Sequence, residues 1–131
     1  MTRPRWPSGD PSAVLSVDTV PASVLRIRRF VVAACREGLG AESCETAALL
    51  VSEVATNALV HGAGRIEVRV LVTGRVLRVE VADASTDLPA PRRGGTLDEG
   101  GRGLTLVDVL ASSWGAEADE LGKVVWFEVT G

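Results

Sequence analysis

Three polar side chains, Glu53, Asn57 and His61, recur at four-residue spacing in a segment that is otherwise rich in apolar residues. A helix places such residues on one stripe roughly 80° wide. Burying a carboxylate without a partner costs free energy, so Glu53 must meet a cation, a hydrogen-bond donor or a water-filled cleft. The stripe is therefore either a chemical site or a structural cluster in which Glu53 pairs with an arginine of the sheet and Asn57 caps a neighbouring backbone.

Two later features could contribute to the same site. Asp83 ends a segment of alternating apolar residues, where a carboxylate can project into a cleft and accept hydrogen bonds from a ligand. The structural alternative is an aspartate that begins a turn. Glycines open a predicted helix in the sequence G-R-G-L at 101–104, and there they let backbone N–H groups approach a phosphate, whose charge the helix dipole favours.

The elements that must position these residues follow from the hydrophobic pattern. Apolar residues at helical spacing predict helices, strict alternation predicts strands, and glycine and proline clusters predict turns and loops. The expected elements are a helix from Pro21 that glycines 38 and 40 end, a largely buried helix at 42–61 with Gly62 as its C′ residue, an antiparallel hairpin at 65–83, a long mobile loop at 84–103, a short helix at 103–112 and a closing pair of strands at 113–129.

This order of elements predicts an α+β fold, a two-layer α/β sandwich with helices on one face of a mixed, mostly antiparallel sheet. Residues 1–12 contain three prolines and are expected to form a flexible N-terminal arm, followed by a single domain at 13–131. Cys35 and Cys44 lack the spacing of a zinc site and are expected to be buried thiols.

Composition limits the classes of function. The chain has 131 residues, of which 46% are apolar and 24% charged, as in globular domains. Its net charge of −3 argues against direct binding to nucleic acid. No apolar segment is long enough to span a bilayer and no secretory signal is evident, so a cytoplasmic protein without a membrane partner is expected. Residues 1–36 contain six arginines and only two aspartates. This asymmetry of charge could orient a protein partner.

Taken in order, the motifs resemble the N, G1 and G2 boxes of the GHKL superfamily of gyrase, chaperone, histidine-kinase and mismatch-repair ATPases. They are E-x-x-x-N-A-x-x-H at 53–61, D-A-S at 83–85, G-R-G-L at 101–104 and the terminal strand GKVVWFEV at 122–129. The small size, with LLVSEVATNALVHG at 49–62 and SWG at 113–115, resembles the stand-alone anti-sigma factor serine kinases of high-GC bacteria. The resemblance covers residues 13–131 and implies a histidine-kinase-like ATP-binding domain.

The resemblance implies a role for each matching residue. Asn57 would bind a magnesium ion that bridges the ATP phosphates, and Glu53 would act as the general base toward the attacking hydroxyl or water. His61 would border the phosphates or the lid. Asp83 would accept a hydrogen bond from the adenine amino group, with Ser85 beside it in the nucleotide pocket. The phosphate-binding end of the ATP lid would comprise Gly101, Arg102, Gly103 and Leu104, with Arg92 and Arg93 as further phosphate contacts.

Two departures from the family pattern carry expectations of their own. Ala84, Ser85 and Thr86 follow Asp83 where fuller G1 boxes have glycines, so a differently shaped adenine pocket is expected. Val124 replaces the threonine of the similar GKTVWFE segments. The loss of a hydroxyl that could assist Asp83 or an ordered water is expected to lower the affinity for ATP.

The leading hypothesis is an ATP- and magnesium-dependent regulator that binds a sigma factor in one state and phosphorylates a serine of an anti-sigma antagonist in another, with a homodimer left open. The alternative is a nucleotide-gated or nucleotide-independent protein-binding module without phosphotransfer. Glu53 separates the two, because binding needs Asn57 and Asp83 whereas transfer needs the base. A third interpretation, the catalytic part of a histidine kinase, is disfavoured because no phosphoacceptor histidine helix precedes the domain.

Overall fold

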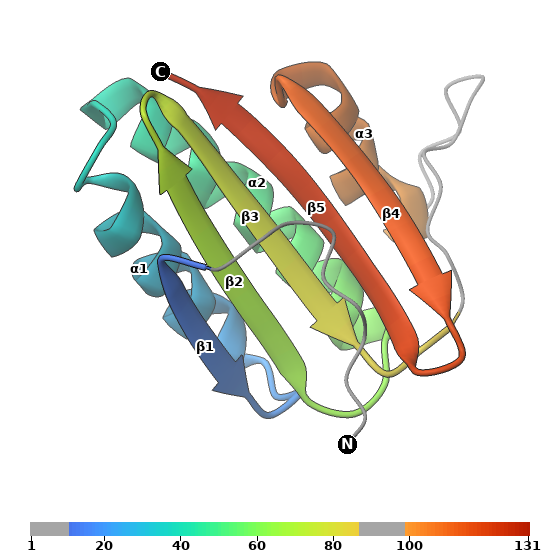
Figure 1. The fold of residues 1–131 in the computed structure, drawn as a ribbon. Helices are drawn as coiled ribbons and strands as arrows, with labels where there is room; N and C mark the ends of the chain where they lie inside the picture. The colour runs from blue at the N-terminus through green and yellow to red at the C-terminus, as the bar shows by residue number, and fades with distance from the viewer. Residues whose placement is uncertain (1–10, 87–98) are drawn as a thin grey trace.

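The computed structural model describes residues 11–86 and 99–131, with the backbone alone for residues 99–104 (Figure 1). Helices and strands follow one another much as the hydrophobic pattern predicts. The described elements are β1 (Ala13–Val17), α1 (Ala22–Cys35), α2 (Ala41–His61), β2 (Ile66–Thr73), β3 (Val76–Asp83), α3 (Glu99–Leu110), β4 (Ser113–Asp119) and β5 (Gly122–Thr130).

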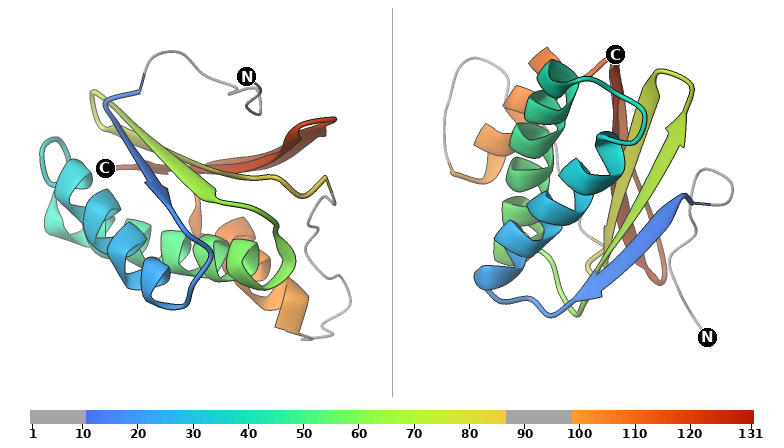
Figure 2. Two further views of the ribbon diagram at one scale, coloured as in Figure 1. Left: turned by 90° about the horizontal axis from the view of Figure 1, so that it is seen from below. Right: turned by 90° about the vertical axis from the view of Figure 1, so that its left-hand side faces the viewer.

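The strands form one sheet in the order β1-β2-β3-β5-β4. The described helices all lie on one face of this sheet, with α2 between α1 and α3 (Figure 2). This arrangement confirms the predicted α+β sandwich. Each pairing among the described strands is antiparallel, so these strands include no parallel pair of the kind a mixed sheet contains.

The core lies between the helices and the sheet. In α1, Ile27, Val31 and Cys35 recur at four-residue spacing and are fully buried. The buried side of α2 carries several alanines and valines, whose small size lets this central helix approach the sheet closely. The sheet contributes alternate residues of β2, β3 and β5, as expected for strands with one face against a core.

The prediction that α2 is buried around most of its circumference is wrong. Leu49 is 42% exposed and Val60 is 64% exposed. The sheet and the two neighbouring helices cover three sides of α2, whereas its fourth side faces solvent. The apolar residues on that side are exposed all the same. Hydrophobic periodicity alone does not distinguish them from buried residues.

Two boundaries also differ from expectation. Gly62 ends α2, but its φ of −89° is not the left-handed conformation of a glycine C′ residue. Helix α3 begins at Glu99 and not near residue 103, so the glycines at 100, 101 and 103 lie within its first turns. Glycine has a low helix propensity, which made this segment look like loop. The rest of the predicted loop, residues 87–98, lies outside the described residues, as does most of the predicted arm.

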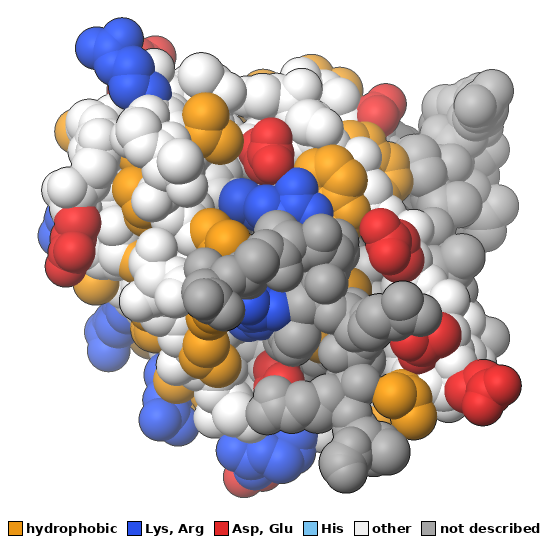
Figure 3. Space-filling view, in the orientation of Figure 1, with side chains coloured by type: hydrophobic (Ala, Val, Ile, Leu, Met, Phe, Trp, Pro, Cys, Tyr) orange, Lys and Arg blue, Asp and Glu red, His pale blue; other side chains and the backbone are white. Residues whose placement is uncertain are grey.

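The face of the sheet away from the helices carries a cluster of charged side chains (Figure 3). The Arg78 guanidinium donates hydrogen bonds of 2.7 Å to Glu80 and 2.8 Å to Glu128. It also stacks over the Trp126 ring at 3.9 Å from the ring centroid. Both carboxylates therefore neutralise an arginine that belongs to the sheet itself.

The two cysteines are buried free thiols near the junction of α1 and α2, as predicted. Burial raises the pKa of the Cys35 thiol to about 12, and a hydrogen bond with Cys44 acts in the same direction.

Candidate functional site

Three segments that are distant in sequence meet at one end of the sheet. There β3 ends at Asp83, β5 begins at Gly122 and α2 ends at His61 (Figure 1). Asp83 and Lys123 are directly opposite each other in the β3–β5 register. The Ala84 N–H donates a 2.7 Å hydrogen bond to the Ala63 carbonyl, which joins the segment after α2 to the end of β3.

The Asp83 carboxylate is held on several sides. Lys123 Nζ lies 3.1 Å from Oδ2 and 3.3 Å from Oδ1. The Ser85 N–H donates a 2.7 Å hydrogen bond to Oδ1. The side chains of Asp83 and Lys123 are only 2% and 3% exposed. This carboxylate is therefore buried, oriented and next to a cation, which suits a hydrogen-bond acceptor for a ligand.

Lys123 is a site residue that the sequence reasoning missed. The alternation of residues in β5 does indicate that Lys123 faces the core, because it lies on the same face of the strand as the core residues Val125, Phe127 and Val129. A charged residue on the core side of a strand needs a partner. The partner could be named only once the β3–β5 register was known.

The expectation built on Val124 is wrong in its geometry. Val124 is buried opposite Ala82 in the register, one position from the Asp83–Lys123 pair. Successive side chains of a strand point to opposite faces of the sheet. A hydroxyl at position 124 would therefore lie on the far face from Asp83, where it could not assist that carboxylate.

Glu53 and Asn57 lie on α2 away from the flank that packs against α1. Ser52 marks that α1-facing flank, because the Arg28 guanidinium of α1 donates a 2.9 Å hydrogen bond to its hydroxyl. At about 100° per residue, Glu53 and Asn57 are roughly 100° and 140° away from Ser52 around the helix, so Asn57 is nearer than Glu53 to the side where α3 packs. Both side chains are partly buried.

Neither Glu53 nor Asn57 has a hydrogen-bond or ion-pair partner within residues 11–86 and 105–131, whose side chains the structure describes. The structural alternative for Glu53 is therefore wrong: Arg69 and Arg78 lie on the helix-free face of the sheet, where both contact Glu80. His61 is exposed in the last turn of α2. The stripe of the three residues thus runs from a partly buried carboxylate toward the sheet end that holds Asp83.

The first turns of α3 contain Gly101, Arg102, Gly103 and Leu104. Helix α3 runs antiparallel to α2 and begins beside its C-terminal half (Figure 2). The N–H groups of a first helical turn have no partner within the helix and carry the positive end of its dipole. Arg92 and Arg93 lie outside the described residues, so only the backbone part of the predicted phosphate contacts can be located.

The described residues contain no group of three or more His, Cys, Asp or Glu that could hold a metal ion. Magnesium commonly keeps several waters and takes only one or two protein ligands beside substrate phosphates. The partly buried Asn57 amide oxygen, which has no partner among the described residues, fits the single protein ligand of such an ion. None of the helices described here has the length and apolarity to cross a lipid bilayer.

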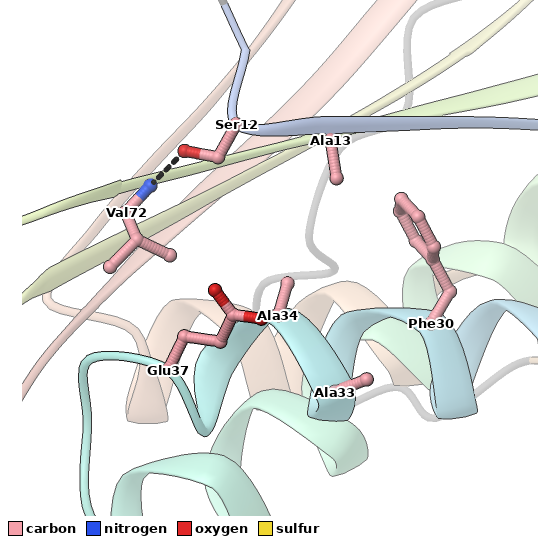
Figure 4. Close-up of a pocket in the computed structure, with 7 residues that line it drawn as sticks. All are labelled: Ser12, Ala13, Phe30, Ala33, Ala34, Glu37 and Val72. Carbon is pink, nitrogen blue, oxygen red and sulfur yellow. Dashed lines mark hydrogen bonds between the residues drawn. The ribbon is translucent and has the colours of Figure 1, made fainter.

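A pocket of about 460 Å³ lies elsewhere, at the opposite end of the sheet between β1 and α1 (Figure 4). The Ser12 hydroxyl accepts a hydrogen bond from the Val72 N–H at its rim. Its lining residues are Ser12, Ala13, Phe30, Ala33, Ala34, Glu37 and Val72. It contains none of the residues that the sequence assigned to a site, so it is separate from the candidate site.

An antiparallel sheet covered by helices on one face, with a carboxylate and an amide on the central helix and an aspartate at a strand end, is the arrangement of a GHKL-type ATPase domain. The family model described as histidine kinase-like ATPase domain matches residues 17–129. The chain therefore belongs to this family of ATP-binding domains. No match was found among the curated proteins.

Several solved structures share the fold. The structure of the RsbU and RsbW domains of Rv1364c from Mycobacterium tuberculosis has a TM-score of 0.64 at 16% identity, with 92% of this chain and 33% of that chain covered. The histidine kinase domain of the Erythrobacter litoralis EL346 blue-light activated histidine kinase has a TM-score of 0.50 at 23% identity, with coverages of 92% and 66%. A second structure of that kinase has a TM-score of 0.52 at 23% identity, with coverages of 76% and 39%. The chain thus spans between a third and two thirds of the length of these structures.

Proposed function

We propose that this ATP-binding domain is a bacterial anti-sigma factor with serine kinase activity toward an anti-sigma antagonist protein. The observation that carries the proposal is the pair of Glu53 and Asn57, partly buried on α2 away from α1 and without a partner among the described side chains. A carboxylate and an amide one helical turn apart, beside a helix N-terminus, suit phosphoryl transfer, which depends on positioning and charge stabilisation.

Each residue then has one task. Asp83 accepts a hydrogen bond from the amino group of adenine and so orients the base. The backbone N–H groups that open α3 bind phosphate oxygens. Asn57 holds magnesium, which neutralises charge on the phosphates when bound. Glu53 accepts the proton of the attacking serine hydroxyl. His61 borders the phosphates at the end of the same stripe.

Support for the partners comes from likeness. The chain resembles stand-alone anti-sigma factor kinases over residues 13–131, and one fold neighbour is described as containing an RsbW domain. Partner surfaces are not encoded in short motifs, so the identity of the sigma factor and of the antagonist must come from binding experiments. A homodimer is a further assembly to be tested by sedimentation.

One observation favours the alternative function, a nucleotide-gated binding module without phosphotransfer. Asp83 and Lys123 are almost fully buried, so a base reaches them only when the residues that cover them are displaced. Such a displacement can change a partner surface without any phosphoryl transfer.

The test is phosphotransfer from radiolabelled ATP to candidate antagonists encoded near the gene, after each antagonist has been shown to bind. Label on a serine of a bound antagonist supports the kinase. Tight ATP binding with no transfer to any antagonist that binds would replace the kinase by the nucleotide-gated module.

A further inference from the structure

The Asp83–Lys123 pair has hydrogen-bonding capacity that it does not use on itself. An ammonium group has three donors and no acceptor. Within residues 11–86 and 99–131, Lys123 Nζ contacts only the two carboxylate oxygens of Asp83. One N–H therefore has no acceptor there, although the side chain is 3% exposed. Buried donors are satisfied in the great majority of cases, so a third acceptor is expected at this position.

The carboxylate has matching capacity on the other side of the pair. Oδ1 accepts from the Ser85 N–H and from Lys123, whereas among the described residues Oδ2 contacts Lys123 alone. Each carboxylate oxygen can accept two hydrogen bonds. The pair thus offers one acceptor site and one donor site next to each other, both on the helix-facing side of the sheet.

We propose that Lys123 is a base-reading residue, which donates a hydrogen bond to the ring nitrogen N1 of adenine while Asp83 accepts one from the neighbouring amino group. This inference rests on the proposed binding of ATP at Asp83. Adenine carries a donor and an acceptor on adjacent atoms, in the order that the pair complements. Guanine presents its acceptor and donor in the reverse order, so the base would have to turn over to satisfy Asp83 and Lys123. Turning over would move the ribose away from the phosphate-binding end of α3.

The surrounding glycines are consistent with a closely packed pair. A Cβ atom at Gly62 would lie 2.7 Å from Asp83 Oδ2, and a Cβ atom at Gly122 would clash with the Asp83 carbonyl. Gly122 also has a φ of 152°, which side chains rarely adopt. Backbone therefore approaches Asp83 from α2 and from β5, leaving the Lys123 ammonium as the side-chain donor beside it.

The test compares ADP with 1-deaza-ADP, in which a C–H group replaces N1 and the amino group is retained. Calorimetric titration of the unmodified protein should show 1-deaza-ADP binding about 10-fold to 100-fold more weakly, as expected for a lost hydrogen bond to a charged donor. The same titrations on Lys123→Met should bring the ratio of the two dissociation constants close to one. A purely structural lysine would lower both affinities together and leave their ratio unchanged.

The outcomes separate this inference from the proposed function. Equal affinities of the unmodified protein for the two nucleotides overturn the role of Lys123 but not ATP binding. An unchanged ratio in Lys123→Met also overturns it, because another group would then read N1. No binding of ADP at all would overturn the proposed function itself. If Lys123→Met does not fold, Lys123→Arg replaces it: the displaced donor should reduce the ratio, and an unchanged ratio contradicts the assignment.

Discussion

Gly62 packs so closely against Asp83 that a Cβ atom at position 62 would lie 2.7 Å from the Oδ2 atom of that carboxylate. The same Cβ atom would also clash with the Ala58 carbonyl. The backbone at Gly62, with φ of −89° and ψ of −170°, is one that any residue can adopt. Glycine is therefore required there by contact and not by conformation, and the end of α2 positions the end of β3.

Gly62→Ala should consequently displace Asp83. We expect a loss of about 1 to 3 kcal/mol in the free energy of unfolding, as for other overpacked sites, together with weaker nucleotide binding. Urea denaturation and calorimetry measure the two effects. Gly40→Ala is the matched control, because a Cβ atom there meets nothing within 4 Å. Equal behaviour of the two variants would contradict the contact argument.

Glu53→Gln separates chemistry from binding. The amide keeps the shape of the side chain but cannot accept a proton from the attacking hydroxyl. Phosphotransfer to a confirmed antagonist should fall by about 10² or more, whereas the dissociation constant for ATP should change little. The matched control is Glu45→Gln, which removes an exposed carboxylate from the same helix. Transfer by Glu53→Gln at the rate of the parent would show that Glu53 is not the base.

Asn57→Ala should fail in a different way. Removal of the amide oxygen deletes the proposed magnesium ligand, so binding of the magnesium–nucleotide complex should weaken, by roughly 10-fold or more. Titration of ADP with and without magnesium measures this effect, and the magnesium dependence shown by the parent should be lost in the variant. Thr56→Ala, which changes the exposed neighbouring position, is the control. Undiminished magnesium dependence in Asn57→Ala would remove the ligand assignment.

The Cys35 thiol predicts a pH dependence of stability. Its pKa rises to about 12 in the folded protein from an ordinary value of 9.0, so the folded state holds the proton between these values while the unfolded state releases it. The stabilisation is complete below about pH 9 and is lost as the pH rises toward 12. Between pH 8 and pH 10.5 the parent should lose about 1 to 2 kcal/mol more than Cys35→Ala. Parallel urea-denaturation profiles for the two proteins would contradict the shift.

Much of the fold follows from the sequence. The alternation of residues 66–73 and 76–83 and the helical spacing of α1 and α2 place these elements to within a few residues, because their periodicity reflects which side is buried. The start of α3 does not follow from the pattern, because its glycines are poor helix formers. The exposure of Leu49 and Val60 depends on the neighbours of α2, which are set by tertiary packing.

The candidate site, like the fold, could be predicted only in part from the sequence. Glu53, Asn57 and Asp83 were singled out from residue type and position, and the roles that the resemblance implies for them stay predictions. Lys123 was missed, because its partner lies 40 residues away and is defined only by the pairing of β3 with β5. The geometry assumed for position 124 was wrong for the same reason, since a side chain's face is fixed by register and not by its proximity in sequence; the lowered affinity for ATP stays a prediction.

Thermal denaturation in the presence of magnesium and ATP, ADP or GTP tests the central claim most directly. A ligand at 100 times its dissociation constant stabilises the folded state by about 2.7 kcal/mol, which is a readily measured rise in melting temperature. We predict this rise for ATP and ADP, a smaller one for GTP at the same concentration, and a reduced one in Asn57→Ala. The absence of any shift at millimolar ATP with magnesium would contradict nucleotide binding at Asp83 and Asn57 and, with it, the proposed kinase.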